Sequence, residues 1–95
     1  YDNGMNVGGH GISDISTFSL YPGKNLGAYG DAGIITTNNK NLYMRIQSIR
    51  NIGAIKKFDH KTIGFNNRMD TIQAAILSHK INFLCYHILL LHGLY

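Results

Sequence analysis

The residues of this sequence with the clearest chemical potential are Ser19 and Lys24. An apolar, β-branched segment ends at Pro22-Gly23 just before the lysine, so we expect Lys24 to lie beyond the end of a strand, where α/β sheets bind ligands. Among apolar neighbours the charged ammonium is disfavoured. A neutral amine can form a Schiff base with an aldehyde or ketone, and the Ser19 hydroxyl can donate to an anionic group. On these residues alone, an ordinary solvated lysine is the alternative.

Two common phosphate-binding motifs resemble this region, and both fail. Gly23-Lys24 matches the end of a P-loop, but Phe18 stands at the first glycine and Asn25 stands where a Mg²⁺-binding hydroxyl is needed. Residues 9–14 contain two glycines of a dinucleotide fingerprint, but an aspartate occupies the third, and a strand follows instead of a helix. Neither nucleotide motif therefore explains the lysine.

Short strands are expected on both sides of the loop that carries the lysine. Residues 15–21 are β-branched and aromatic and predict one strand, and residues 33–37 predict a second. Residues 1–13 and 23–31 are rich in turn-forming residues and predict loops.

Two helices follow. Residues 40–51 predict a helix with Asn39 as its N-cap, because an Asn side chain accepts from free amides of the first turn. Its expected apolar face is Leu42, Ile46 and Ile49, and Gly53 suits its C-terminal turn.

Residues 55–67 read as a polar connection, and residues 70–73 look like a capping box opening the second helix. The expected apolar stripe of that helix is Ile72, Ala75, Ile76 and Phe83, interrupted by His79.

The end of the sequence is unusual because residues 81–95 contain no charged Lys, Arg, Asp or Glu. This apolar tail is too short to span a bilayer. It is interpreted as a buried helix end, as an oligomer contact, or as an aberrant terminus.

Composition limits the class of protein. The chain has 95 residues and a net charge of +4, with its basic residues dispersed, so a nucleic-acid arm is not indicated. The single cysteine, Cys85, cannot form an internal disulfide, which favours a reducing compartment, most simply the cytoplasm. Cys85, His87 and His92 match no zinc spacing, so no metal is expected.

Three motifs together resemble one enzyme family. They are FSLYPGKNLGAYGDAGIITTN (residues 18–38), SIRNIG (residues 48–53) and GFNNRMDTIQAAIL (residues 64–77). In order and spacing they resemble the DegT/DnrJ/EryC1/StrS aminotransferases, which use pyridoxal phosphate to aminate nucleotide-linked keto-sugars. The resemblance implies an α/β fold, as a fragment of the fold-type-I large domain with its mixed, mainly parallel sheet. Residues 1–84 would be the partial large domain, and residues 85–95 depart from the family pattern.

The resemblance also implies roles for individual residues. Lys24 matches the lysine that forms a Schiff base with pyridoxal 5'-phosphate and moves protons during transamination. Ser19 matches a serine that binds the cofactor phosphate, and Asn66 matches an asparagine that reaches the phosphate of the neighbouring subunit of a homodimer. Asp70 is interpreted as a helix cap. Arg68 is interpreted as a structural or interface ion-pair former.

The implied partners are a nucleotide-linked keto-sugar and glutamate as amino donor, in polysaccharide or antibiotic-sugar synthesis, with no nucleic acid or membrane. The family's acidic residue for the pyridine nitrogen and its ring-stacking aromatic precede the matched segment, so the chain alone is expected to be inactive. Two alternative functions remain open. One is a non-catalytic remnant that associates through its apolar tail, and the weaker one is a small basic phosphate- or nucleic-acid-binding module.

Overall fold

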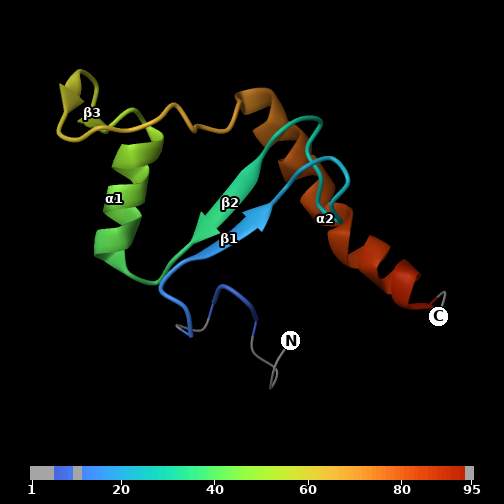
Figure 1. The fold of residues 1–95 in the computed structure, drawn as a ribbon. Coiled ribbons are helices and arrows are strands. Elements are labelled where there is room, and N and C mark those ends of the chain that lie inside the picture. Colours follow the sequence, from blue (N-terminus) through green and yellow to red (C-terminus); the bar gives the residue numbers. More distant parts are fainter. Residues whose placement is uncertain (1–5, 10–11, 94–95) are drawn as a thin grey trace. The chain divides into compact units, whose positions relative to one another are not determined.

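The computed structural model describes residues 6–9 and 12–93, and its elements follow the order β1, β2, α1, β3, β4, α2 (Figure 1). The chain divides into two compact units, which we describe separately. The first unit comprises Ile35–Arg68 with the described part of Tyr1–Thr17. The second comprises Phe18–Ile34 and the described part of Met69–Tyr95. The predicted opening loop lies partly outside the described residues, namely at 1–5, 10 and 11.

The two strands predicted around the lysine loop are confirmed, although both are shorter than expected. β1 (Ser16–Ser19) and β2 (Gly33–Thr36) form a two-stranded sheet, and their arrows run in opposite directions (Figure 1). One further backbone bond follows the strands, from the Leu20 N–H to the Ala32 carbonyl at 2.8 Å. β1 ends at Ser19, shortly before Pro22, which lacks an N–H and cannot donate a further ladder bond.

The first helix, α1 (Lys40–Arg50), is confirmed together with its predicted cap. Asn39 has an extended backbone, and its Oδ1 accepts from the N–H groups of Asn41 at 2.9 Å and Leu42 at 3.2 Å. These bonds satisfy two of the four free donors of the first turn.

The buried face of α1 differs from the predicted one. Leu42 and Ile46 are half-buried as expected, but Ile49 is exposed, and the one buried residue of the helix is Ser48. Apolar periodicity therefore predicted the buried face correctly at two positions, and at the third the buried residue is its neighbour, Ser48.

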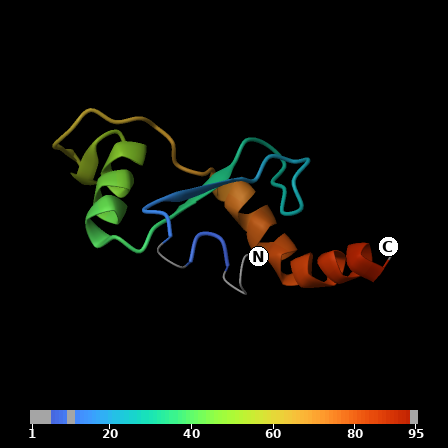
Figure 2. The ribbon, with the colours of Figure 1, turned by 60° about the horizontal axis from the view of Figure 1, so that its bottom comes forward.

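A small hairpin follows α1, where the sequence had predicted only a polar connection. β3 (Ala54–Lys56) pairs antiparallel with β4 (Asp59–His60), with an irregular register between Ala54 and Lys56. Figure 2 shows this hairpin next to the end of α1, and β3 contacts α1. Phe58 makes the turn with a positive φ of 67°. The prediction was wrong because no Asn-Gly or Gly-Gly pair, the usual signal of a tight hairpin, marks this turn.

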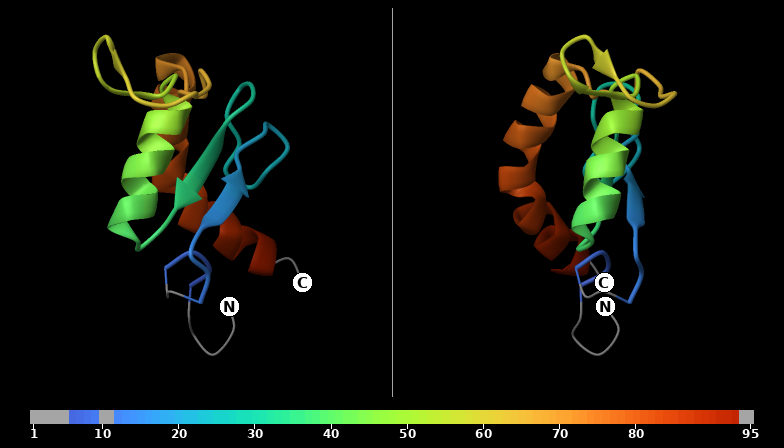
Figure 3. Two further views of the ribbon diagram at one scale, coloured as in Figure 1. Left: turned by 60° about the vertical axis from the view of Figure 1, so that its left-hand side comes forward. Right: turned by 90° about the vertical axis from the view of Figure 1, so that its left-hand side faces the viewer.

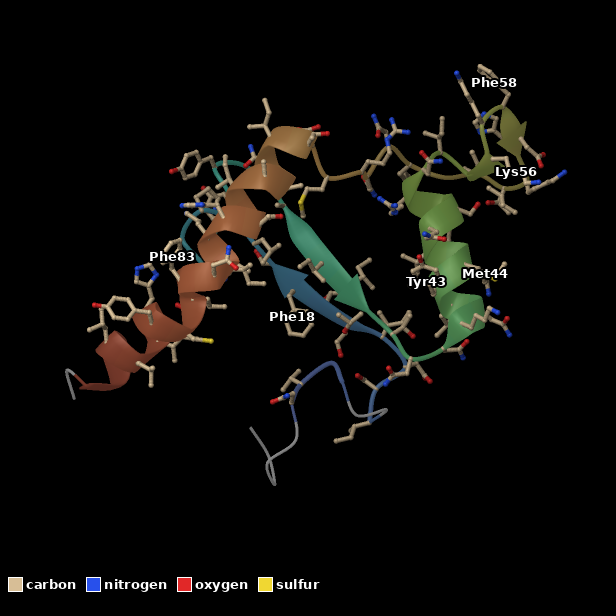
Figure 4. The ribbon with its side chains drawn as sticks, turned by 180° about the vertical axis from the view of Figure 1, so that it is seen from behind. Phe18, Tyr43, Met44, Lys56, Phe58 and Phe83 are labelled. Atoms are coloured by element: carbon tan, nitrogen blue, oxygen red, sulfur yellow. The ribbon has the colours of Figure 1, made fainter. Side chains whose placement is uncertain are left out.

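The second helix, α2 (Thr71–Gly93), is one continuous helix that includes the described part of the apolar tail (Figure 3). The predicted stripe is wrong at three of its four positions, because Ile72, Ala75 and Phe83 are exposed while Ile76 is half-buried. Ile72 is 74% exposed and Phe83 48% exposed, and Phe83 projects outward from α2 in Figure 4. The face that is buried or half-buried instead runs through Gln73, Leu77, Lys80, Leu84 and Ile88.

The described apolar tail is mostly exposed, so the interpretation of a buried helix end is wrong for most of its residues. Five of its large side chains from 81 to 90 are between 47% and 70% exposed, namely Ile81, Phe83, Tyr86, Leu89 and Leu90, whereas Leu84 and Ile88 are half-buried. Within residues 6–9 and 12–93, no helix combines the length and apolar character needed to cross a membrane.

The core of the second unit is small and lies between α2 and the lysine loop. Leu20, Ala28 and Leu77 are its buried members. Partly buried side chains pack against them, namely Leu26, Ala32 and Met69. This cluster ties the loop that carries Lys24 to α2.

Candidate active site

The lysine loop begins with a tight turn at the end of β1. The Lys24 N–H donates to the Tyr21 carbonyl at 2.9 Å, which closes a four-residue turn with Pro22 and Gly23 at its centre. Proline suits the first central position of such a turn because its φ is already fixed near −65°. The turn places Lys24 five residues after Ser19, the last residue of β1.

The same loop folds back on its own start. The Ala28 N–H donates to the Leu20 carbonyl at 2.8 Å. Gly27 lies so close to the Pro22 backbone that a Cβ atom at position 27 would meet the Pro22 carbonyl oxygen at 2.5 Å. Only glycine permits this approach, so the shape of the loop depends on Gly27.

Ser19 and Lys24 line one pocket of about 480 Å³ that lies entirely within the second unit. The apolar members of its lining are Phe18, Leu20, Leu26 and Ile34. Pockets that hold small ligands combine apolar walls with a few polar groups in this way. Two of the three predicted site residues are thus brought together.

The Ser19 hydroxyl is available as a donor. Its oxygen accepts from the Tyr21 N–H at 3.4 Å, a long contact, and this leaves the O–H proton free for a ligand. Ser19 is exposed. A bond to the backbone therefore uses the Ser19 hydroxyl only as an acceptor and does not use its proton.

Lys24 is also exposed, which corrects the expectation that apolar neighbours enclose it. The apolar residues of the pocket form a wall beside the lysine, and the pocket is open to solvent. The described residues alone do not desolvate the ammonium.

Asn66 belongs to the first unit. It forms an isolated antiparallel bridge with Asn51, and its side chain is exposed. Backbone bonds hold the segment on either side, from the Phe65 N–H to the Ile49 carbonyl at 2.7 Å and from the Asn67 N–H to the Arg50 carbonyl at 2.9 Å. The Asn66 side chain thus projects from a backbone fixed against the end of α1.

The two charged residues of the third motif have local contacts. Arg68 Nη1 donates to Asn51 Oδ1, so its partner is an amide where an ion pair had been expected. Asp70 directly precedes α2, and its carbonyl accepts the Ala74 N–H at 3.0 Å, as in an N-cap position. Gln73 does not complete the predicted capping box, because its side chain bonds the Tyr29 N–H in the lysine loop.

A second pocket, of about 290 Å³, lies within the first unit at the end of α1. Arg50, Asn51 and Arg68 line it together with Ser48. The Ser48 hydroxyl is buried and has no hydrogen-bond partner among the described atoms. Sequence reasoning did not find Ser48, since a serine inside a helical pattern carries no signal of burial.

Sequence reasoning also missed two residues of α2 that contact the lysine loop. Gln73 bonds the loop at Tyr29, and Lys80 bonds it at Gly27. Their signal was present as a spacing of seven residues that places both on one helix face. No group of three or more His, Cys, Asp or Glu side chains that could hold a metal occurs in the described part of the chain. The side chain of His92 lies outside that part.

Comparison with known proteins identifies the family of this chain. The sequence matches the DegT/DnrJ/EryC1/StrS aminotransferase family over residues 1–86. The chain belongs to this family. Family membership confirms the resemblance drawn from the three motifs.

Individual family members agree with this assignment. The chain is 46% identical over 65 residues to the dTDP-3-amino-3,4,6-trideoxy-alpha-D-glucose transaminase of Streptomyces venezuelae, with 68% of this chain and 17% of the relative covered. It is 43% identical over 75 residues to the UDP-N-acetyl-3-dehydro-alpha-D-glucosamine 3-aminotransferase of Acidithiobacillus ferrooxidans, with 79% and 20% covered. These relatives are named as transaminases of nucleotide-linked sugars.

A solved aminotransferase structure confirms the predicted fold class. The crystal structure of Streptomyces venezuelae DesV in complex with a ketimine intermediate matches this chain with a TM-score of 0.73 at 42% identity. The match covers 76% of this chain and 19% of DesV. The fold is therefore the α/β fold of this aminotransferase family, and the chain spans about a fifth of the length of the relatives it matches.

Proposed function

We propose that this chain carries the cofactor lysine of a pyridoxal-phosphate-dependent transaminase that acts on nucleotide-linked keto-sugars. One observation supports the proposal above the others. In a chain of this aminotransferase family, the Ser19 hydroxyl and the Lys24 amine line the same pocket. A primary amine can condense with an aldehyde, and a hydroxyl can donate a hydrogen bond to a phosphate.

The pocket passes a simple test of fit for this cofactor. Its volume of about 480 Å³ lies in the range of small-molecule sites. Its apolar wall suits an aromatic ring, and the free Ser19 proton suits a phosphate oxygen. The cofactor, when bound, supplies an aldehyde that condenses with amines and a ring that accepts an electron pair.

The residues of the chain then take distinct roles. Lys24 would hold the cofactor by condensing its Nζ amine with the aldehyde, with loss of water, and its amine would then be the group that moves protons. Ser19 would hold the cofactor phosphate by donating a hydrogen bond from its hydroxyl. Asn66 is assigned to the phosphate bound by the neighbouring subunit of a homodimer, where its amide would add a neutral donor. We place the protein in the cytoplasm, in keeping with its single free cysteine, Cys85.

The substrate class comes from the relatives. Their names specify a dTDP-linked sugar in one case and a UDP-linked sugar in another. We therefore assign a nucleotide-linked keto-sugar as amino acceptor, with glutamate as donor. The 95-residue chain alone is expected to bind cofactor without turning over substrate.

The decisive experiment traps the cofactor on the protein. The purified chain is mixed with pyridoxal 5′-phosphate, reduced with borohydride and mapped by peptide mass spectrometry. We expect label on Lys24 at several times the level on Lys40, an exposed lysine at the start of α1. Lys24→Arg should abolish the preferred label, and the matched Lys40→Arg should not. An even distribution over the lysines of the wild-type chain would refute the proposal.

The exposed tail favours a second candidate, a remnant that acts by association. Five large apolar side chains between positions 81 and 90 are exposed on α2, and no charged residue interrupts them. Exposed apolar surface of this kind marks interaction sites or aggregation.

A further inference from the structure

One face of α2 lies against the lysine loop and contacts it in three ways. The residues are Gln73, Leu77 and Lys80, spaced by four and three positions, so they share one side of the helix. All three and the loop belong to the second unit. We call Gln73, Leu77 and Lys80 the α2 clamp.

Gln73 fixes the far end of the loop. Its Oε1 accepts the Tyr29 N–H at 2.8 Å, across 44 positions of sequence. A Cβ atom at Gly30 would lie 3.0 Å from Gln73 Nε2, so the amide packs against the backbone of residue 30 as well. The Gln73 side chain thus satisfies a backbone N–H of the loop that has no partner strand to bond among the described residues.

Lys80 holds the loop two residues earlier. Its Nζ donates to the Gly27 carbonyl at 2.8 Å and lies 5.0 Å from the centroid of the Tyr29 ring. Lys80 is half-buried, and the ion pair between Lys61 and Asp59 is the one salt bridge found among the described residues, so no carboxylate competes for Lys80. A hydrogen bond from a charged donor and a cation–π contact are both stronger when partly desolvated.

Leu77 lies between these two polar contacts in sequence. It is buried in the cluster with Leu20 and Ala28, at the start and end of the folded-back loop. Burial of Leu77 therefore stabilises the contact between α2 and the loop. The hydrogen bonds of Gln73 and Lys80 fix its geometry, because hydrogen bonds are directional and apolar contacts are not.

Contacts within the loop connect the clamp to the lysine. Gly27, whose carbonyl Lys80 holds, lies against the backbone of Pro22. Pro22 begins the centre of the turn that closes with the bond from the Lys24 N–H to the Tyr21 carbonyl. A shift of Gly27 would move the Pro22-Gly23 turn, and with it Lys24.

From this arrangement we infer that Gln73 and Lys80 are positioning residues for Lys24. They hold the loop so that the Lys24 amine stays in its pocket beside the Ser19 hydroxyl. The claim that these residues aid the reaction of Lys24 rests on the proposed function. The claim that they hold the loop in place rests on the contacts alone. Preorganisation of this kind saves the entropy of ordering a reactive group at each turnover.

The first test measures the loop without cofactor, by residue-resolved amide hydrogen exchange in the full chain. We expect Gln73→Leu to raise exchange at the Tyr29 amide about tenfold, the loss of one protecting bond. Lys80→Met should raise exchange at Tyr29 and at Ala28, which closes the loop. Lys80→Arg should restore protection, since guanidinium can both donate to the carbonyl and stack on the ring. Gln47→Leu and Lys56→Met are the matched controls, as both residues are exposed in the first unit.

The second test measures the consequence at Lys24. Each variant is mixed with pyridoxal 5′-phosphate, reduced with borohydride, and mapped for the ratio of label on Lys24 to label on Lys40. We expect the ratio to fall about tenfold in Lys80→Met and Gln73→Leu and to recover in Lys80→Arg, as for loss of one orienting contact. Circular dichroism shows whether each variant retains its helices. If Lys80→Met or Gln73→Leu is partly unfolded, the label ratio of Lys80→Arg, which keeps the charge, decides the test for Lys80.

The outcomes separate the two claims. Unchanged loop exchange in Lys80→Met and Gln73→Leu would overturn the inference. Faster exchange with an unchanged label ratio would also overturn it, because the contacts would then be structural only. If the wild-type chain shows no preference for Lys24, the proposed function fails, and the positioning role for the reaction fails with it, whereas loop exchange still reports the contacts.

Discussion

The Gly53 N–H donates to the Ser48 carbonyl at 2.8 Å, and this bond closes the C-terminal end of α1. The bond spans five residues, as in a Schellman motif, with Ile52 and Gly53 both at positive φ, 53° and 75°. A β-branched residue in the left-handed region is strained. The bond therefore joins a strained turn to Ser48, the one buried residue of the helix.

Replacing Gly53 should destabilise the first unit strongly. An alanine Cβ at this position would clash with the Thr62 carbonyl oxygen, in a backbone conformation that side chains already disfavour. We expect Gly53→Ala to lower the free energy of unfolding by about 3 kcal/mol. Urea denaturation measures this. Gly23→Ala is the matched control, because nothing lies within 4 Å of a Cβ there. Equal stability of the two variants would contradict the described turn.

Replacing Ser48 should have the opposite effect. Its hydroxyl is buried without a hydrogen-bond partner among the described atoms, so its removal relieves a desolvation cost. We expect Ser48→Ala to stabilise the chain by about 1 kcal/mol in urea denaturation. Ser78→Ala on the exposed side of α2 controls for the higher helix propensity of alanine. If Ser48→Ala is destabilising, the hydroxyl has a partner that this structure does not describe.

The elements that could be predicted from sequence are those with local causes. β1, β2 and α1 follow from composition, period and caps, and Asn39 could be identified because its partners lie two and three residues away. The β3–β4 hairpin could not be predicted, since its turn uses Phe58 at positive φ without a glycine signal.

The contacts of the site were harder to predict because their partners are remote in sequence. Gln73 looked like part of a capping box, yet its partner is Tyr29. The polar residues Gln73 and Lys80 lie on the half-buried face of α2, whereas Ile72 is exposed, so apolar periodicity selected the wrong side. The proximity of Ser19 and Lys24 was predictable from the strand end, but the exposure of Lys24 was not, because it depends on what else surrounds the pocket.

The cap of α1 offers a third test of the local structure. Asn39→Ala removes the acceptor for two first-turn amides and should lower the free energy of unfolding by about 1 kcal/mol. Asn41→Ala, one position into the first turn, should be neutral or slightly stabilising, since its backbone takes part in the cap and its side chain does not. Hydrogen exchange at the Asn41 and Leu42 amides should rise in the first variant alone. Equal protection in both variants would show that the cap is not formed in solution.

The apolar tail provides a test of the association candidate. Leu89 is 70% exposed in the uncharged part of α2, and Ile72 is 74% exposed at its other end. If the tail drives association, Leu89→Glu should weaken it about tenfold, because a charge cannot be buried cheaply in an apolar contact. Ile72→Glu, equally exposed and on the same helix, should leave association unchanged. Sedimentation velocity over a range of concentrations measures both variants. A monomeric wild-type chain, or equal effects of the two substitutions, would exclude the tail as the associating surface and leave the aminotransferase site as the chain's one supported role.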